Sequence, residues 1–132
     1  MDMKLALVVL PVSDVDRAKA FYEQAGFHLD VDHSAGEDFR VVQLTPPGSS
    51  CAVALMRNAD AAGSVSGLHL VVEDLVAARD ALVAAGVAVD EPHHYGETGQ
   101  APGVHPERAS YATFAPFADP DGNGWLLQEV RS

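Results

Sequence analysis

The chain has little basic charge, almost no cysteine and no long hydrophobic run. Its 132 residues hold 8 Lys and Arg against 19 Asp and Glu, so the net charge is -11. Nucleic-acid binding needs a basic surface that displaces counterions from phosphates, and we therefore predict no nucleic-acid partner. The single cysteine, Cys51, allows no internal disulfide and fits a reducing compartment. The apolar run within residues 1–12 is too short to span a membrane, and no small-residue cleavage site follows it. We expect a cytoplasmic protein with no membrane partner.

The acidic composition leaves two interpretations open. A cleft inside a negative field concentrates positively charged molecules, so the net charge of -11 would suit a cationic ligand. The same charge can also do no more than keep the protein soluble. The length predicts one compact domain, 1–132, which is large enough to bury a core without disulfides.

The second half of the chain repeats the pattern of the first half. A shift of 60 positions superimposes apolar residues, helix-capping residues and helix-ending glycines: Leu10 on Leu70, Asp14 on Asp74, and Gly26 on Gly86. A period of this length with two copies indicates a duplicated module. We predict two strand-helix-strand-strand-strand modules in an α+β fold, with module one at 1–57, a linker at 58–66 and module two at 67–132.

The expected strands follow from apolar and β-branched runs between turn residues. They are Leu5–Val12, Phe27–Val31, Asp38–Thr45 and Ala52–Met56, then Leu68–Val72, Val87–Asp90, Tyr111–Phe117 and Trp125–Val130. Residues 91–108 are predicted to form a long polar loop, of the kind that often serves as a lid or a binding loop. Asp119-Pro120-Asp121-Gly122-Asn123 is predicted to be a tight turn. The turn partly matches the start of an EF-hand calcium-binding loop, which needs a Glu at its twelfth position. Counted from Asp119, that position is Val130, so we do not predict a calcium site.

Two motifs carry a resemblance to a known family. The first runs from Leu10-Pro11-Val12-Ser13-Asp14 through Phe21-Tyr22 to Gly26-Phe27, and the second is the turn at 119–123. With the duplicated module, they resemble the vicinal oxygen chelate superfamily, which includes glyoxalase I, the bleomycin-resistance proteins and the extradiol dioxygenases. The resemblance covers essentially the whole chain. It implies two βαβββ modules whose curved mixed sheets enclose a cup-shaped cavity, and it implies a homodimer.

The resemblance also implies where a metal site would lie, because metal-dependent members direct His or Glu side chains into the cup from the first and fourth strands of each module. The first-strand positions, seven residues before the capping Asp, hold Leu7 and Gly67. The last-strand position, three residues after the turn Asn, holds Leu126, and residues 51–56 offer no His or Glu. We therefore predict that the usual metal site is missing.

His69 and Gln128 are the polar residues that the resemblance leaves for the cup. Each lies two residues past an empty ligand position, so strand alternation places both on the cup face and turns Glu129 away from it. One imidazole and one amide make a poor set for a divalent ion. We interpret them as hydrogen-bonding groups for a ligand. His69 alone remains a weak metal candidate, and it can equally be a core histidine.

Further candidate residues come from the aromatic and charged positions. Tyr111, Phe117 and Trp125 are predicted to contact a ligand in the cup. Arg40 can bind a carboxylate or phenolate there, or it can form a surface salt bridge. Three histidines lie in the polar loop at 93, 94 and 105, and adjacent histidines on a strand would point to opposite faces.

Two functions from different classes follow. The first is a metal-free protein that binds or sequesters a small organic molecule, as the bleomycin-resistance branch does. The alternative is a lyase, isomerase or dioxygenase-type oxygenase whose Zn, Fe, Ni or Mn ion polarises vicinal oxygens and is held by His69 with loop histidines. A metal-free acid–base enzyme that uses a loop histidine and a cup carboxylate is a third option.

Overall fold

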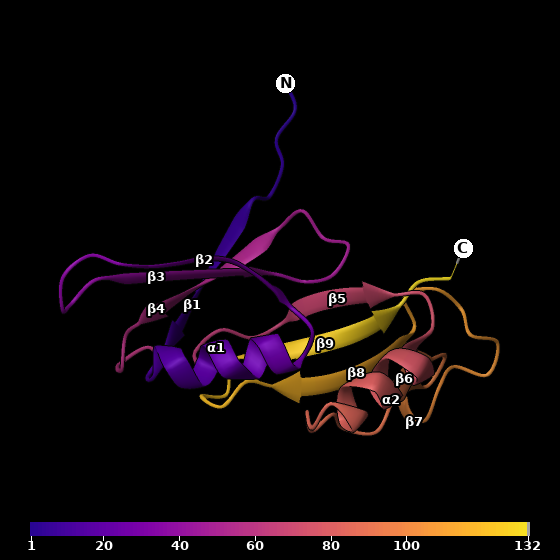
Figure 1. Ribbon diagram of the computed structural model, residues 1–132. Coiled ribbons are helices and arrows are strands. Elements are labelled where there is room, and N and C mark those ends of the chain that lie inside the picture. The colour runs from indigo at the N-terminus through magenta and orange to yellow at the C-terminus, as the bar shows by residue number, and fades with distance from the viewer. Residues whose placement is uncertain (132) are drawn as a thin grey trace. The chain divides into compact units, whose positions relative to one another are not determined.

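The computed structural model describes residues 1–131, which form two compact units (Figure 1). Unit 1 consists of Met1–Val65 together with Asp119–Asn123. Unit 2 consists of Ser66–Ala118 together with the chain from Gly124 onward. Each unit contains one sheet and one helix, as the duplicated pattern predicts. No helix in residues 1–131 has the length and apolar character that crossing a membrane requires.

Unit 1 has the predicted strand-helix-strand-strand-strand order. Its elements are β1 (Leu7–Val12), α1 (Val15–Gln24), β2 (His28–Ser34), β3 (Arg40–Thr45) and β4 (Ala52–Arg57). The sheet order is β1-β4-β3-β2, with β1 and β4 parallel and the other pairs antiparallel. α1 begins after Asp14, whose side chain accepts a hydrogen bond from the Arg17 N–H at 3.1 Å. Leu10, Val42 and Leu55 lie opposite one another on adjacent strands and are fully buried, so they form the centre of this core.

Unit 2 repeats the order and adds a hairpin. Its elements are β5 (Leu68–Val72), α2 (Leu75–Ala84), β6 (His93–Gly96), β7 (Gly99–Pro102), β8 (Thr113–Ala118) and β9 (Gly124–Glu129). The sheet order is β5-β9-β8-β6-β7, with β5 and β9 parallel. Asp74 caps α2 by accepting a hydrogen bond from the Ala77 N–H at 3.1 Å. Equivalent caps at Asp14 and Asp74 explain why both helices start at the predicted positions.

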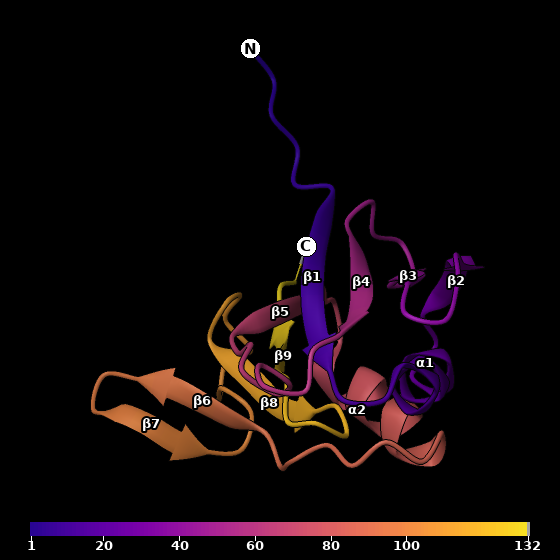
Figure 2. The same cartoon turned by 90° about the vertical axis from the view of Figure 1, so that its left-hand side faces the viewer.

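Two sequence predictions need correction in unit 2. The polar loop predicted at 91–108 contains the β6–β7 hairpin, which projects beyond β8 in Figure 2. Residues 87–90, predicted to be a strand, make a single bridge between Val89 and Phe117. β6 takes the place beside β8 because His93 and His94 pair with Phe114 and Thr113. The hairpin is polar in composition, so its strand character comes from this pairing rather than from its own β propensity.

The turn at 119–123 is confirmed, and its side chains are engaged in bonds within unit 1. The Asp119 Oδ1 accepts the backbone N–H groups of residues 121, 122 and 123 at 2.9–3.0 Å, and its Oδ2 accepts the Tyr22 hydroxyl at 2.8 Å. Asn123 donates from its amide to the Pro11 carbonyl at 3.0 Å. Gly63 lies so close that a Cβ there would sit 2.1 Å from the Asp121 carbonyl oxygen. The carboxylate of Asp119 is thus used to shape the turn.

Candidate functional site

The two faces of the unit 2 sheet differ in chemistry. On one face, which we call the α2 face, Trp125, Leu127 and Glu129 alternate along β9 and are buried. The Glu129 carboxylate accepts the N–H of Leu75, the first residue of α2, at 2.9 Å. Glu129 therefore lies on the opposite side of β9 from Gln128, as strand alternation predicts. Its partner Arg108 donates from Nε at 2.8 Å and from Nη2, and this guanidinium lowers the pKa of Glu129 below its ordinary value.

The opposite face, which we call the His69 face, is built by the alternate residues of the same strands. Strand register places His69 beside Leu126, Val71 beside Gln128, and Phe114 between Gln128 and His93. The residues of this face are His69, Val71, His93, Tyr95, Gln100, Pro102, Phe114, Pro116, Leu126 and Gln128. None of them is an Asp, Glu, Lys or Arg.

Phe114 is the centre of an aromatic group on the His69 face. The His93 ring stacks on it with centroids 5.7 Å apart and planes at 19°. Tyr95 and His69 meet it edge-on, at centroid distances of 5.5 Å and 6.0 Å. These separations are typical of favourable ring pairs. Sequence reasoning missed Phe114, although alternation from Gln128 and the β8–β9 hairpin would have assigned it to this face.

His69 and Gln128 do share one face, as predicted, but they lie on neighbouring strands with an offset. His69 is beside Leu126, and Gln128 is one alternate position further along. The Gln128 amide donates to the Tyr111 carbonyl oxygen at 3.3 Å. Tyr111 itself has a left-handed φ of 69° and an exposed side chain. Its backbone therefore orients Gln128, which is a different role from the ring contact that the sequence suggested.

Phe117 and Trp125 lie on the α2 face, which corrects their place in the predicted ligand site. They are paired across β8 and β9, their rings are parallel at 6.1 Å, and each is only 4% exposed. The reason is parity, because Trp125 precedes Gln128 by three positions on the same strand and must point to the other side of the sheet. They belong to the core of unit 2.

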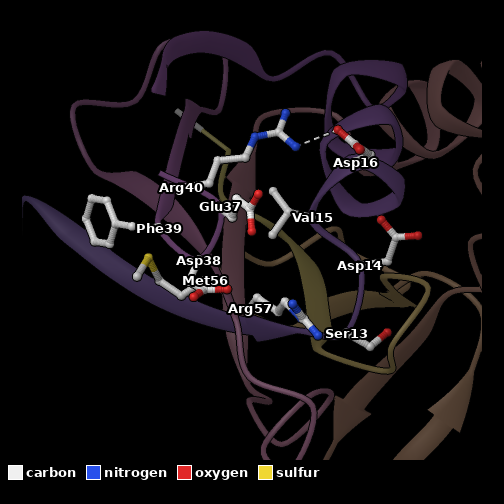
Figure 3. A pocket seen from close by; sticks show the side chains of 10 residues that line it. All are labelled: Ser13, Asp14, Val15, Asp16, Glu37, Asp38, Phe39, Arg40, Met56 and Arg57. Atoms are coloured by element: carbon white, nitrogen blue, oxygen red, sulfur yellow. Dashed lines mark hydrogen bonds and ion pairs between the residues drawn. The ribbon is translucent and has the colours of Figure 1, made fainter. Parts of the chain in front are cut away.

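Arg40 forms the salt bridges that the sequence left as one of two options. Its guanidinium donates to Asp16 at 2.6 Å and to Asp32 at 2.9 Å and 3.0 Å. These bonds raise the pKa of Arg40 and hold the pKa of Asp32 well below its usual range. Figure 3 shows the side chain reaching from β3 toward α1, at one wall of a pocket of about 380 Å³ in unit 1. Arg40 therefore links β3 to α1 and β2 through these ion pairs.

The remaining histidines of the predicted loop lie away from His93. Adjacent positions on β6 alternate as predicted, and His94 contacts His105 with ring centroids 5.7 Å apart. The Gly103 carbonyl oxygen lies 2.9 Å from His94 Nδ1, so that nitrogen is the donor. The Nδ1 of His105 accepts the N–H groups of Glu107 and Ala109 at 3.2 Å and 3.3 Å. Both rings are therefore used to shape residues 103–109.

The side chains of β5 and β9 and the residues around them do not form a ligand set for the divalent ion that metal-dependent members of the vicinal oxygen chelate superfamily bind. The positions that would supply ligands hold Leu7, Gly67 and Leu126, and the polar residues nearby are one imidazole, His69, and one amide, Gln128. A divalent ion of the zinc or iron type takes three protein ligands drawn from His and carboxylate. Within residues 1–131, no group of three or more His, Cys, Asp or Glu side chains is placed to hold a metal ion.

Comparisons with known proteins agree with this architecture. The chain is 32% identical to TnmS3, an antibiotic-binding protein from Streptomyces sp. CB03234, covering 98% of this chain and 97% of that one with a TM-score of 0.75. It is 34% identical to a glyoxalase/bleomycin resistance protein from the same organism, covering 96% of this chain and 100% of that one with a TM-score of 0.68. It is 27% identical to the uncharacterized protein YetH of Bacillus subtilis, over 98% of this chain and 100% of the relative.

The sequence pattern of one family spans nearly the whole chain. Its model matches residues 4–127, which include every strand and both helices apart from the last two residues of β9. The two sheets with their helices are the fold that the duplicated module predicted. The chain belongs to the Glyoxalase/Bleomycin resistance protein/Dioxygenase superfamily.

Proposed function

We propose that the protein binds and sequesters a planar, largely apolar small molecule on the His69 face. The observation that carries the proposal is the aromatic group centred on Phe114, where His69, His93 and Tyr95 surround one ring. Ligand sites are typically apolar and aromatic with a few polar groups that set orientation. Here Gln128 supplies an amide and the two histidines supply ring nitrogens.

The distribution of charge supports the same function. In the described part of unit 2, Glu129 is the single charged residue of the five strands, and it lies on the α2 face. The His69 face therefore offers no fixed charge to a ligand, and binding there relies on ring stacking, apolar contact and neutral hydrogen bonds. TnmS3, 32% identical over 98% of this chain, is an antibiotic-binding protein. A ligand of antibiotic-like size and aromatic character suits the face described here.

Fluorescence anisotropy with pyrenylmethanol, an uncharged planar probe, tests the proposal. We expect saturable binding by the wild-type protein and at least about fivefold weaker binding by Phe114→Ala, because one stacked ring pair contributes about 1 kcal/mol beyond its buried area. Val76→Ala on the exposed side of α2 is the matched control, since it also shortens an apolar side chain of unit 2. Equal affinities for wild type and Phe114→Ala would contradict the proposal, as would the absence of saturable binding.

Assembly and location rest on the family. We expect a homodimer in the cytoplasm, as the resemblance and the single cysteine suggest. Light scattering of the purified protein measures the mass in solution. A mass equal to one 13.9 kDa chain at every protein concentration would contradict the expected homodimer.

A further inference from the structure

A cavity of about 520 Å³ opens at one end of the His69 face. Its lining includes Asp90, Glu91, Pro92, His93, Pro102 and Pro116. His93 and Pro116 are also members of the His69 face, beside Phe114 and Leu126 respectively. The cavity therefore continues the aromatic site, and a molecule stacked on Phe114 could extend a substituent into it.

The walls of this cavity combine apolar rings with one uncompensated carboxylate. Three prolines present carbon-rich surface without backbone N–H groups. Glu91 is paired with Arg79, whose Nη2 lies 3.3 Å from its carboxylate. The other Arg79 bonds go to the carbonyl oxygens of Asp90 and Val89, at 2.9 Å and 3.0 Å. No residue of the described chain bonds to the Asp90 carboxylate.

The position of Asp90 is fixed by its backbone rather than by its side chain. Its N–H donates to the Pro116 carbonyl at 2.8 Å, and its own carbonyl accepts from Arg79. Two carboxylates and one guanidinium leave this corner with a net charge of about -1. The whole chain carries -11, and such a field raises the local concentration of cations. A neutral aromatic surface thus adjoins a negative corner.

We propose that the cavity at Asp90 is a subsite for a protonated amino group, so that the preferred ligand is an aromatic molecule with a short amine-bearing substituent. This inference rests on the proposed function, because the aromatic part must lie on Phe114. Asp90 is then a specificity-determining residue: it accepts hydrogen bonds from the ammonium, and the proline rings contact the adjoining methylene groups.

Three probes with one ring system separate the subsite from the aromatic site. Pyrenylmethylamine carries an ammonium at neutral pH, pyrenylmethanol is uncharged, and pyrenylacetic acid is an anion. We expect the amine to bind wild type about fivefold more tightly than the alcohol, which is the scale of a partly exposed ion pair, and the acid to bind more weakly than either. The preference for the amine should shrink as the salt concentration rises.

Asp90→Asn keeps the size of the side chain and removes its charge. We expect this variant to bind the amine and the alcohol equally, with the affinity for the alcohol unchanged from wild type. Asp80→Asn on α2 is the matched control, because it removes one negative charge, as Asp90→Asn does, but outside the cavity. It should keep the preference for the amine.

The outcomes distinguish the two proposals. Wild-type protein that binds all three probes equally overturns the amine subsite and leaves the aromatic site in place. A preference for the amine that survives in Asp90→Asn, or that falls equally in Asp80→Asn, overturns the role of Asp90. Failure of all three probes to bind overturns the proposed function and the subsite with it.

Discussion

Each unit contains an arginine bound to a carboxylate near the start of its helix, and the two arrangements differ in burial. In unit 1, Arg40 joins Asp16 and Asp32 at a surface where the Arg40 and Asp32 side chains are 28% and 25% exposed. In unit 2, Arg108 meets Glu129, which is 0% exposed and also accepts the first N–H of α2. The two arginines are about equally exposed, since the Arg108 side chain is 30% accessible, and the difference lies in the carboxylates. Water can replace the partners of Asp32 but does not reach the carboxylate of Glu129. Similar residue pairs therefore contribute differently to stability.

Removing the buried carboxylate should give the largest effect. Glu129→Ala leaves the Leu75 N–H without an acceptor and Arg108 without its main partner, so we expect the free energy of unfolding to fall by about 2–3 kcal/mol. Urea unfolding followed by circular dichroism measures this. Leu127→Ala, a truncation of the next buried residue on the same face, provides a reference for the cost of lost packing alone. If Glu129→Ala lowered the free energy of unfolding by less than about 0.5 kcal/mol, the buried ion pair of unit 2 would stabilise the protein no more than an ordinary surface residue does.

The same carboxylate should make the stability of the protein depend on pH. The folded-state pKa of Glu129 lies below its ordinary value of 4.5, so its contribution is present above that pH and is lost as the pH falls through the folded pKa. The difference in unfolding free energy between wild type and Glu129→Gln should therefore shrink below pH 4.5. Comparing the two proteins cancels the titration of all other carboxyls. A difference that stays constant down to pH 3 would contradict this assignment of the stabilising charge.

The exposed network should give the smallest effect. Asp32→Asn removes one charged partner each from Lys19 and Arg40. Because water reaches all three side chains, we expect a loss of unfolding free energy well below that of Glu129→Ala. Added salt should reduce the loss further, since exposed charges are screened. Urea unfolding at low and high salt tests both points. A loss equal to that of Glu129→Ala, or one that does not respond to salt, would show that exposure is not the relevant difference.

The sequence predicted the parts of the fold that depend on local chemistry. Asp14 and Asp74 cap the helices as expected because an N-cap needs only its own following residues. The orientation of Glu129 also followed from strand alternation. Phe117 and Trp125 lie on the face opposite to the predicted one, because the same alternation that directs Gln128 one way directs Trp125 and its cross-strand neighbour Phe117 the other. The β6–β7 hairpin could not be predicted in this way, because its pairing with β8 is a contact between residues distant in sequence.

The sequence alone identifies only some of the residues of the candidate site. His69 and Gln128 were assigned to one face from their spacing, and the structure adds Phe114, His93 and Tyr95 around them. Those additions depend on the register of β6 against β8, which no short motif in the chain encodes. The sequence left Arg40 with two roles, a contact to a ligand carboxylate or phenolate and a surface salt bridge. The structure shows the salt bridges, to Asp16 of α1 and Asp32 of β2.

The turn at 119–123 has a consequence for how the chain could be divided. It is covalently part of the connection between β8 and β9, yet its side chains complete unit 1 by bonding to Tyr22, Ser13 and Pro11. A fragment that ends at residue 65 would lack the acceptor of the buried Tyr22 hydroxyl and the donor to the Pro11 carbonyl. Unit 1 is therefore completed by a segment that lies more than fifty residues further along the chain, and a cut at residue 65 would separate it from that segment.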